Sequence, residues 1–304
     1  MTAIRQGIRE LTRTGGAPVT VPVQVVSRTR ITSGFDRVVV EGPGLDQYAG
    51  PRPADAFKLM IPAQGHAHVE PPVPGPDGMP QWPEGTAVPV LRAFTVRYFD
   101  AEARRLTFDV AVHDHGAAAQ WLGRVNPGEQ VVLTGMRREF WVGDGVVHHL
   151  LVADASALPA AAAILESLGD EVAVTAIVQA AAEDDHALLP DRPGAAIHRI
   201  VGPAGAGPDC ALVEAVSRTA PHPGRTQAWI AAEADAVRAV RRLVRTELGV
   251  AADDLHASAY WKSGMSSDTR DATLLTVYRA AMADGVDLTD PAAVADLELG
   301  ESVS

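Results

Sequence analysis

The sequence predicts two domains, an antiparallel β-barrel followed by an α/β domain built on a parallel sheet. The 304 residues are about twice the length of an average domain. The first half carries short β-branched runs broken by Gly, Pro and Asp, which are typical of an antiparallel sheet or barrel. In the second half strand-like and helix-like segments alternate, and this order indicates a parallel sheet.

Short strand-like segments make up the predicted barrel. They are residues 18–32, 36–41, 56–61, 91–98, 104–112 and 130–133. The Pro- and Gly-rich segment 62–89 interrupts them as a long loop. The run Val-Gly-Asp-Gly at 142–145 predicts a hairpin turn. It lies just before the point where short strand-like runs give way to alternating strands and helices.

The predicted α/β domain begins near Val147. Its expected strands are 147–152, 172–178 and 228–232, and its expected helices are 156–168, 211–218 and 234–248. We therefore divide the chain into an N-terminal extension, a barrel, an α/β domain and an acidic C-terminal tail. These four parts span residues 1–19, 20–147, 148–283 and 284–304.

Composition excludes several classes of protein. With 47% hydrophobic and 21% charged residues, the chain is an ordinary globular protein with a core. The formal net charge of −12 argues against a nucleic-acid-binding surface, although a local basic pocket for an anion is compatible with it. Because the tail holds much of the acidity, we expect part of this charge to lie away from any site.

The chain has a single cysteine, Cys210, which cannot form an internal disulfide. We expect it to be a small buried side chain. No His/Cys cluster has the spacing of a zinc site, so no metal site is predicted.

Residues 1–13 lack the apolar core of a signal peptide, and no run reaches the roughly 18 apolar residues of a membrane span. We expect a cytoplasmic protein, monomeric or weakly oligomeric.

The first chemically suggestive segment is the strand at 91–97. Alternate residues of a strand share a face, so Arg92 and Phe94 point one way and Ala93 and Thr95 the other. An arginine can grip a diphosphate with two hydrogen bonds, and a hydroxyl can hydrogen-bond a flavin ring nitrogen. On the pattern alone, an ordinary strand with two exposed arginines is the favoured interpretation of these residues.

A second segment runs from His113 to Trp121. A strand ends here, small residues follow, and a helix is expected to start, so its free backbone amides form a ready anion site. Gly116 and the alanines 117–119 let a ligand approach the backbone closely. We interpret His113 and His115 as polar groups at a turn or beside a cofactor, because no third metal ligand accompanies them.

Strand-to-helix junctions follow in the second half. The run 150–159 contains Asp154 and Ser156, and its small residues resemble a phosphate-cradling turn without G-x-G-x-x-G. The simpler interpretation is a helix capped by one of these two residues. Glu233 ends the strand of the second junction. Farther along the chain, Trp261 could stack on a ligand ring and Lys262 could bind an anion. The alternative is that Trp261 is a core aromatic residue and Lys262 is solvated.

Together these stretches resemble the siderophore-interacting protein family, the NAD(P)H- and flavin-dependent ferric-siderophore reductases. Residues 92–97 are similar to the family pattern R-x-Y/F-T-x-R, and residues 113–121 to H-G-x-G-P-A-S-x-W. Four more family patterns follow the same order along the chain. They resemble residues 55–59, 153–159, 229–233 and 259–264. The resemblance covers nearly the whole chain, from about residue 21 to residue 279.

The resemblance implies a ferredoxin-reductase-like architecture, with a flavin-binding barrel and a nicotinamide-binding α/β domain. It implies FAD as prosthetic group and hydride transfer from NADH or NADPH to the flavin. Single-electron reduction of a chelated ferric ion would follow and release Fe(II). The residues implied in cofactor binding are Arg92, Phe94, Thr95, His113, Gly116, Ala117, Ala118, Ala119, Asp154, Ser156, Glu233 and Trp261, with Thr95 and Trp261 nearest the chemistry.

The chain departs from the family pattern at several small residues. Ala119 replaces a serine, which removes one hydroxyl from the cofactor site. Ala153, Ala232 and Ala259 each replace a glycine. These departures bear on cofactor affinity and on the choice of nicotinamide, and they leave the fold prediction unchanged.

The partner implied by the resemblance is a ferric siderophore or another ferric chelate. Many such chelates are anionic, so we predict a basic rim that attracts them, formed by Lys58, Arg137 and Lys262. Solvated surface side chains are the alternative for each of these residues. Three other functions stay open: a flavin or ferredoxin reductase with another acceptor, a non-catalytic ferric-siderophore binder, and a flavoprotein of biosynthesis.

Overall fold

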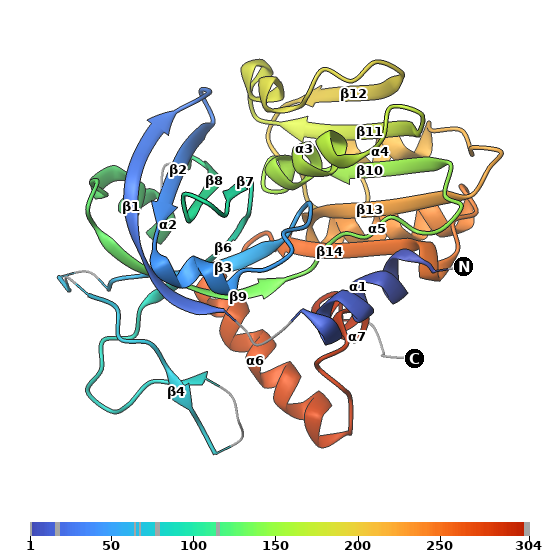
Figure 1. The fold of residues 1–304 in the computed structure, drawn as a ribbon. Coiled ribbons are helices and arrows are strands. Elements are labelled where there is room, and N and C mark those ends of the chain that lie inside the picture. The colour runs from blue at the N-terminus through green and yellow to red at the C-terminus, as the bar shows by residue number, and fades with distance from the viewer. Residues whose placement is uncertain are drawn as a thin grey trace.

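The computed structural model describes residues 2–15, 19–63, 65–66, 68–76, 80–113 and 116–300, and His115 lies outside this range. The described chain forms two large sheets that lie side by side, with helices around the second of them, and a small two-stranded sheet (Figure 1). The predicted fold class, an antiparallel barrel-like sheet followed by a parallel-sheet domain, is confirmed.

The first sheet is antiparallel and has seven strands in the order β6-β3-β9-β1-β2-β8-β7. Its strands are β1 (Thr20–Arg30), β2 (Phe35–Glu41), β3 (Ala56–Ile61), β6 (Val90–Thr95), β7 (Tyr98–Asp100), β8 (Arg105–Ala111) and β9 (Gln130–Arg137). The sheet curls toward closure, because the Arg97 amide beyond β6 donates to the Thr107 carbonyl of β8 at 2.8 Å. Strict alternation of exposed and buried residues at the start of β1 directs every second side chain into the barrel core.

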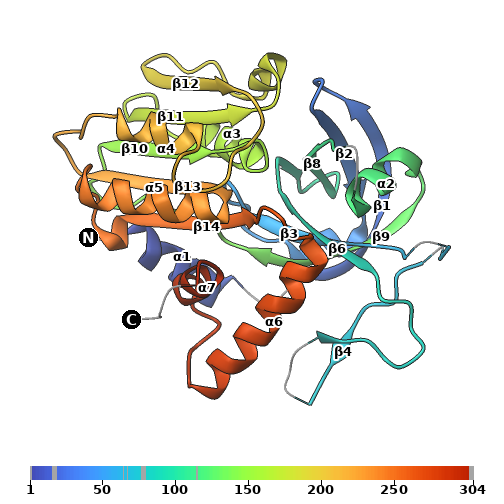
Figure 2. The same cartoon turned by 180° about the vertical axis from the view of Figure 1, so that it is seen from behind.

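Other elements of the first half are short. They are the 3-10 helix η1 (Pro43–Gln47), the small strand pair β4 (Val73–Pro74) and β5 (Pro80–Gln81), and helix α2 (Ala117–Arg124). The β4–β5 pair belongs to the predicted Pro- and Gly-rich loop and projects away from the barrel (Figures 1 and 2). Trp121 anchors α2, since its side chain is fully buried in the barrel core.

The second sheet is parallel and has the order β12-β11-β10-β13-β14. Its strands are β10 (His148–Ala153), β11 (Ala173–Ala180), β12 (Ala195–Val201), β13 (Thr226–Glu233) and β14 (Leu255–Trp261). Its helices are α3 (Leu158–Ser167), α4 (Ala211–Ser217) and α5 (Ala234–Thr246), with 3-10 turns η2 (Glu183–Leu188) and η3 (Ala252–Asp254). Helices α4 and α5 cover one face and α3 the other (Figure 2), so every residue of β10 is buried, as a central parallel strand requires.

Three terminal helices complete the molecule: α1 (Ile4–Thr14), α6 (Ser267–Ala283) and α7 (Pro291–Glu298). Helices α1 and α7 lie side by side (Figures 1 and 2). Arg5 of α1 donates to both carboxylate oxygens of Asp296 at 2.8 and 3.2 Å, and Arg9 pairs with Asp290 at 2.7 Å. The sequence patterns did not predict α1 or α7.

Most predicted elements occur within a few residues of their expected bounds, and Cys210 is buried as predicted. The predicted hairpin at 142–145 was wrong, because that turn leads from the first sheet into β10 of the second. The predicted cap of α3 was also wrong. Its N-cap is Ala157, and Asp154 instead accepts from the Ser156 amide in a local turn.

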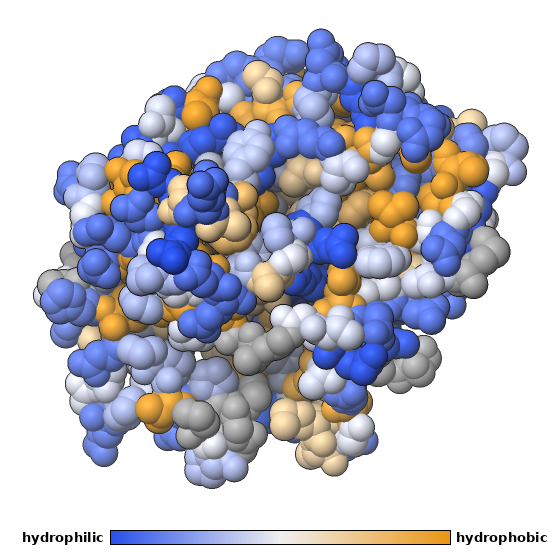
Figure 3. All heavy atoms as spheres, viewed as in Figure 1, coloured by the Kyte–Doolittle hydropathy of each residue, from blue (hydrophilic) through white to orange (hydrophobic). Residues whose placement is uncertain are grey.

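Two further features of the molecule concern its surface. Among the residues that the structure describes, no helix is long and apolar enough to cross a membrane. On the face drawn in Figure 3, hydrophilic and hydrophobic residues are interspersed. The exposed large apolar side chains, such as Val73, Tyr98 and Val201, come from separate elements.

A buried arginine joins the two sheets. Arg97 lies just after β6, and its guanidinium donates to both carboxylate oxygens of Glu166 on α3 at 2.5 Å. The same guanidinium lies 4.3 Å from the centre of the Tyr98 ring. A second contact forms where the Asp185 carboxylate of η2 accepts from the Thr32 hydroxyl at 2.6 Å. Such contacts fix the position of the barrel relative to the parallel sheet.

We predict that Arg97→Ala lowers the free energy of unfolding by roughly 2–3 kcal/mol, because it removes a buried guanidinium that bonds Glu166 and is the second cation, beside Arg37, near the buried Asp109. Urea unfolding followed by circular dichroism measures this loss. Arg105→Ala is the matched control, since Arg105 pairs with Glu41 on the surface and should change the stability by less than about 0.5 kcal/mol. Equal effects of the two substitutions would contradict the role given to Arg97.

Candidate functional site

The strand β6 carries the first group of predicted site residues. Arg92 donates to the Leu91 carbonyl at 2.7 Å and to both carboxylate oxygens of Asp268 on α6 at 2.7 and 3.3 Å. Its side chain is 13% exposed. A guanidinium has five N–H donors, so Arg92 retains donors for an anionic ligand beside these contacts.

Phe94 and Thr95 follow on opposite faces of the strand, as the alternation predicted. The Phe94 ring packs against Phe108 and Phe57, with centroid distances of 5.0 and 6.2 Å, and it is half-buried at the edge of the barrel core. Thr95 is buried beside Tyr260 of β14. This residue therefore lies where the barrel meets the parallel sheet.

The start of α2 forms an uncapped helix end. Gly116 is its N-cap, no side chain caps it, and the Gln120 amide is the first to bond back, to the Gly116 carbonyl at 3.0 Å. The amides of residues 117–119 therefore have no acceptor within the helix. Gly116 has φ +100°, and a Cβ added there would meet nothing within 4 Å. His113 is exposed shortly before this turn.

At the carboxyl edge of the parallel sheet, four predicted residues come together around the buried carboxylate of Asp154. One oxygen accepts from the amide of Ser156 at 2.9 Å and from its hydroxyl. The other accepts from the Trp261 indole at 2.7 Å and from the Glu233 amide at 3.0 Å. Asp154 thus joins the ends of β10, β13 and β14.

Glu233 continues this network with its own carboxylate. It caps α5 by accepting from the amides of Asp235 and Ala236 at 2.7 and 3.0 Å. Its other oxygen accepts from the Ser263 amide at 3.0 Å. Since the hydrogen-bonding capacity of Asp154 and Glu233 is largely used inside the protein, they shape the sheet edge and hold the Trp261 ring, and they leave little capacity for a ligand.

Burial raises the pKa of Asp154, and the hydrogen bonds from Ser156, Trp261 and Glu233 oppose that rise. The carboxylate form suits this geometry, because every neighbour named is a donor.

A buried polar cluster fills the seam between the two sheets. Glu139 lies in the connection from β9 to β10 and accepts from Ser258 at 3.0 Å. The His256 Nε2 lies 2.7 Å from the same carboxylate oxygen, and Arg137 pairs with the other. Burial alone would raise the pKa of Glu139, but Arg137, His256 and Ser258 outweigh it and lower the pKa to about 2.

Tyr260 completes the seam. Burial, reinforced by the Glu139 carboxylate, raises the pKa of its hydroxyl. This hydroxyl lies beside Thr95 yet forms no hydrogen bond of normal geometry within the described part of the chain. A buried hydroxyl without a partner is costly, so a ligand with a polar atom at this point of the seam would be favoured.

Each member of the predicted basic rim is paired with a carboxylate. Lys58 of β3 lies 3.0 Å from Asp271 of α6. Arg137 of β9 pairs with Glu139 and, at 3.1 Å, with Glu298 of α7, and Lys262 lies 3.8 Å from Asp235 of α5.

Part of the acidity of the tail was expected to lie away from any site. Its Glu298 does not, because it contacts the rim residue Arg137 and also accepts from Tyr278 at 2.7 Å.

Sequence reasoning missed the seam cluster and the acidic residues of α6. One signal was present, because His256, Ser258 and Tyr260 recur at every second position of β14 and so share one face of the strand. The sequence gives no comparable signal for Asp268 or Asp271, because their partners are about 180 to 210 residues away.

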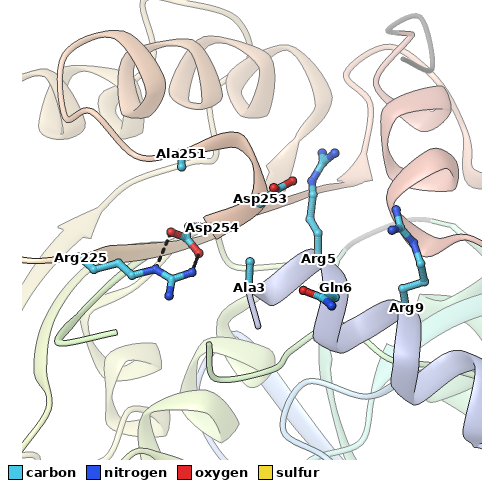
Figure 4. Close-up of a pocket in the computed structure, with 8 residues that line it drawn as sticks. All are labelled: Ala3, Arg5, Gln6, Arg9, Arg225, Ala251, Asp253 and Asp254. Atoms are coloured by element: carbon cyan, nitrogen blue, oxygen red, sulfur yellow. Dashed lines mark hydrogen bonds and ion pairs between the residues drawn. The ribbon is translucent and has the colours of Figure 1, made fainter. Parts of the chain in front are cut away.

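Two hollows of the described structure lie elsewhere. One, of about 390 Å³, lies between α1 and the segment before β14, and its walls include Arg5, Arg9 and Asp253 (Figure 4). In that view Arg225 is joined to Asp254 by two hydrogen bonds, at 2.9 and 2.7 Å. The other, of about 340 Å³, lies between His68 and strands β1 and β9. Neither hollow is lined by the predicted site residues.

We predict that Asp154→Asn opens the sheet edge. The amide would place a donor against two existing donors, which costs about 2–3 kcal/mol of stability. Hydrogen exchange at the Glu233 and Ser263 amides should become faster than in the wild type. Asp253→Asn is the control because Asp253 is exposed. Unchanged protection of both amides in Asp154→Asn would show that the network is dispensable.

The lowered pKa of Glu139 predicts a pH dependence of stability. In the unfolded chain the carboxyl titrates near 4.5, and in the fold near 2. Its stabilising contribution is therefore complete above pH 4.5 and is lost as the pH falls from 4.5 toward 2. Glu139→Gln should lower stability at pH 7 by roughly 2–3 kcal/mol, and this difference from the wild type should shrink below pH 4.5.

Urea titrations between pH 7 and pH 3 measure this difference, with Glu171→Gln, an exposed position, as control. A gap between Glu139→Gln and the wild type that stays constant over this range would contradict the assignment.

Comparison with known proteins assigns both halves of the chain to one family. Residues 24–140 match the siderophore-interacting FAD-binding domain, and residues 146–264 match the siderophore-interacting protein domain. An uncharacterised protein of Mycobacterium tuberculosis is 32% identical over 261 residues, which cover 81% of this chain and 91% of that protein.

Two relatives carry names that state an activity. The NADPH-dependent ferric-chelate reductase of Escherichia coli is 35% identical over 139 residues, covering 46% of this chain and 53% of that protein. The ferric vibriobactin reductase of Vibrio cholerae is 26% identical over 245 residues, covering 80% and 89% of the two chains.

Solved structures agree with this assignment. A siderophore utilization protein from T. fusca has a TM-score of 0.70 and 32% identity, covering 82% of this chain and 95% of that one. The ferredoxin reductase of carbazole 1,9a-dioxygenase has a TM-score of 0.55 and 18% identity, covering 81% and 70%, which shows a shared fold. The chain therefore belongs to the siderophore-interacting protein family, a family of FAD-binding oxidoreductases with the ferredoxin-reductase-like fold.

Proposed function

We propose that the chain is a flavin-dependent reductase of ferric siderophores or related ferric chelates, which takes its electrons from NADH or NADPH. The observation that carries this proposal is the seam at Thr95 and Tyr260. There the strand that bears the predicted flavin residues contacts the strand whose end is fixed by the Asp154 network. Two cofactor sites that face one seam allow direct transfer between their rings.

The residues of the barrel fit FAD. Arg92 and the free amides at 117–119 are donors suited to the diphosphate, and the methyl side chains there leave the backbone accessible. Thr95 and the unpartnered Tyr260 hydroxyl are polar groups suited to the edge of the isoalloxazine. Phe94 supplies an aromatic edge whose inner side is already packed in the barrel.

The sheet edge of the second domain fits a nicotinamide. Asp154 holds the Trp261 indole in one position, and Ser156 and Glu233 order the turns on either side.

The arginines of α5, the helix that begins after Glu233, do not distinguish NADH from NADPH. On it, Arg238 donates to the Leu299 carbonyl at 2.6 Å, and Arg241 lies 3.1 Å from Asp296. These two arginines therefore have structural partners already.

When bound, FAD would supply the redox chemistry, which is hydride acceptance from the nicotinamide and one-electron transfer to Fe(III). Each hydride carries two electrons, so one NAD(P)H reduces two ferric ions and one proton is released. The chain's own residues would bind and orient the cofactors. Arg92 and the start of α2 would hold the diphosphate, Thr95 would lie at the edge of the flavin ring, and Trp261 would orient the nicotinamide ring.

The first experiment is an absorbance spectrum of the purified protein after addition of FAD, followed by anaerobic titration with NADH and with NADPH. We expect flavin bands that bleach with one of the two nicotinamides and recover when a ferric chelate is added. Recovery with ferredoxin or free flavin only would identify another acceptor. Failure to take up FAD while a ferric chelate still binds would instead identify a non-catalytic binder.

We predict that Arg92→Ala weakens FAD binding about tenfold to a hundredfold, because a charge-assisted contact to the diphosphate is lost. Quenching of flavin fluorescence on titration into apoprotein measures the dissociation constant. Arg105→Ala removes an equal charge from the same barrel and should leave that constant unchanged. An unaltered constant for Arg92→Ala would remove this residue from the flavin site.

A further inference from the structure

The basic rim is neutralised by the C-terminal part of the chain. Lys58 faces Asp271, Arg137 faces Glu298, and the neighbouring Arg92 faces Asp268. These three acidic residues belong to α6 and α7, beyond residue 264, where the match to the family's second domain ends. The predicted rim residues are basic, but in the folded protein their positive charges are close to neutralised by these neighbouring carboxylates.

Helix α6 reaches the barrel chiefly through these charges. Asp268 and Asp271 are three residues apart on α6 and so lie on one face. They meet two adjacent strands, since Leu59 beside Lys58 on β3 pairs in register with Arg92 on β6. Ala281 is the one buried residue in the described α6, so apolar packing does little to hold this helix on the barrel.

The pair of Lys58 and Asp271 is accessible to solvent. Their side chains are 43% and 34% exposed, and such a pair contributes little to stability. It does change the potential that an approaching ligand meets. An unpaired lysine here would attract an anion, whereas the pair attracts neither sign strongly. The net charge of −12 adds a general repulsion of anions.

We propose that Asp271 is a specificity-determining residue, with Asp268 beside it, and that it makes the site select ferric chelates of zero or positive net charge over polyanionic ones. Neutral tris-hydroxamate complexes are the substrate class that fits. This inference rests on the proposed ferric-chelate reductase function. It adds that the acidic face of α6 sets the preference for charge.

The test compares a neutral with an anionic substrate in the FAD-loaded protein. Ferrichrome is a neutral tris-hydroxamate, and ferric trioxalate is a trianion. NAD(P)H-driven Fe(II) release, trapped by a ferrous chelator, gives kcat/KM for each. Quenching of tryptophan fluorescence gives the dissociation constants without turnover. We expect Asp271→Asn to raise the trioxalate-to-ferrichrome ratio of kcat/KM, and of affinity, about threefold to tenfold at low ionic strength.

Two controls locate the effect. Asp284→Asn removes the same charge from the exposed end of α6 and should leave the ratio unchanged. Adding Lys58→Gln to Asp271→Asn should return the ratio to the wild-type value, because the freed lysine is what attracts the anion. The inference is overturned if Asp271→Asn leaves both ratios unchanged, or shifts them no more than Asp284→Asn does. If the wild type reduces neither chelate, the proposed function itself fails, while the affinity ratio still tests the role of Asp271.

Discussion

The arrangement of the molecule depends on the buried carboxylate of Glu139. It lies in the connection between the two sheets and is bonded to His256 and Ser258 of β14, so it ties the last strand of the second sheet to the end of the first. A buried carboxylate needs hydrogen-bond partners, and Glu139 finds them on the face of β14 that is turned toward the end of the first sheet. Tyr260, on the same face of that strand, is thereby brought beside Thr95.

Carboxylates organise the second half of the candidate site in the same manner. Asp154 and Glu233 direct their oxygens at backbone amides and at the Trp261 indole, so the sheet edge keeps its shape before any ligand arrives. The departures from family glycines are compatible with this edge, because Ala153, Ala232 and Ala259 are buried and packed within strands. Preorganised edges of this kind lower the ordering cost of binding.

The sequence predicted the fold class and the main strands because short strands with turns, and then alternating strands and helices, leave clear periodic signals. The family resemblance implied that Asp154, Ser156, Glu233 and Trp261 belong to one region, and the structure brings them together at the carboxyl ends of β10, β13 and β14. The sequence could not predict α6, which has no apolar face, or the partners of Lys58 and Arg92, which depend on tertiary contacts between distant segments.

The net charge at a site depends on which segments the fold brings together there, as the rim residues show. Read from sequence, Lys58, Arg137 and Lys262 indicate a surface for anions, yet each lies within 4 Å of a carboxylate from α5, α6 or α7. Asp268 and Asp271 of α6 contact the barrel through Arg92 and Lys58, so these contacts set the local potential there. A change at Asp271, which contacts Lys58, can therefore alter the charge preference of the rim without altering the buried seam or the sheet edge that would hold the nicotinamide.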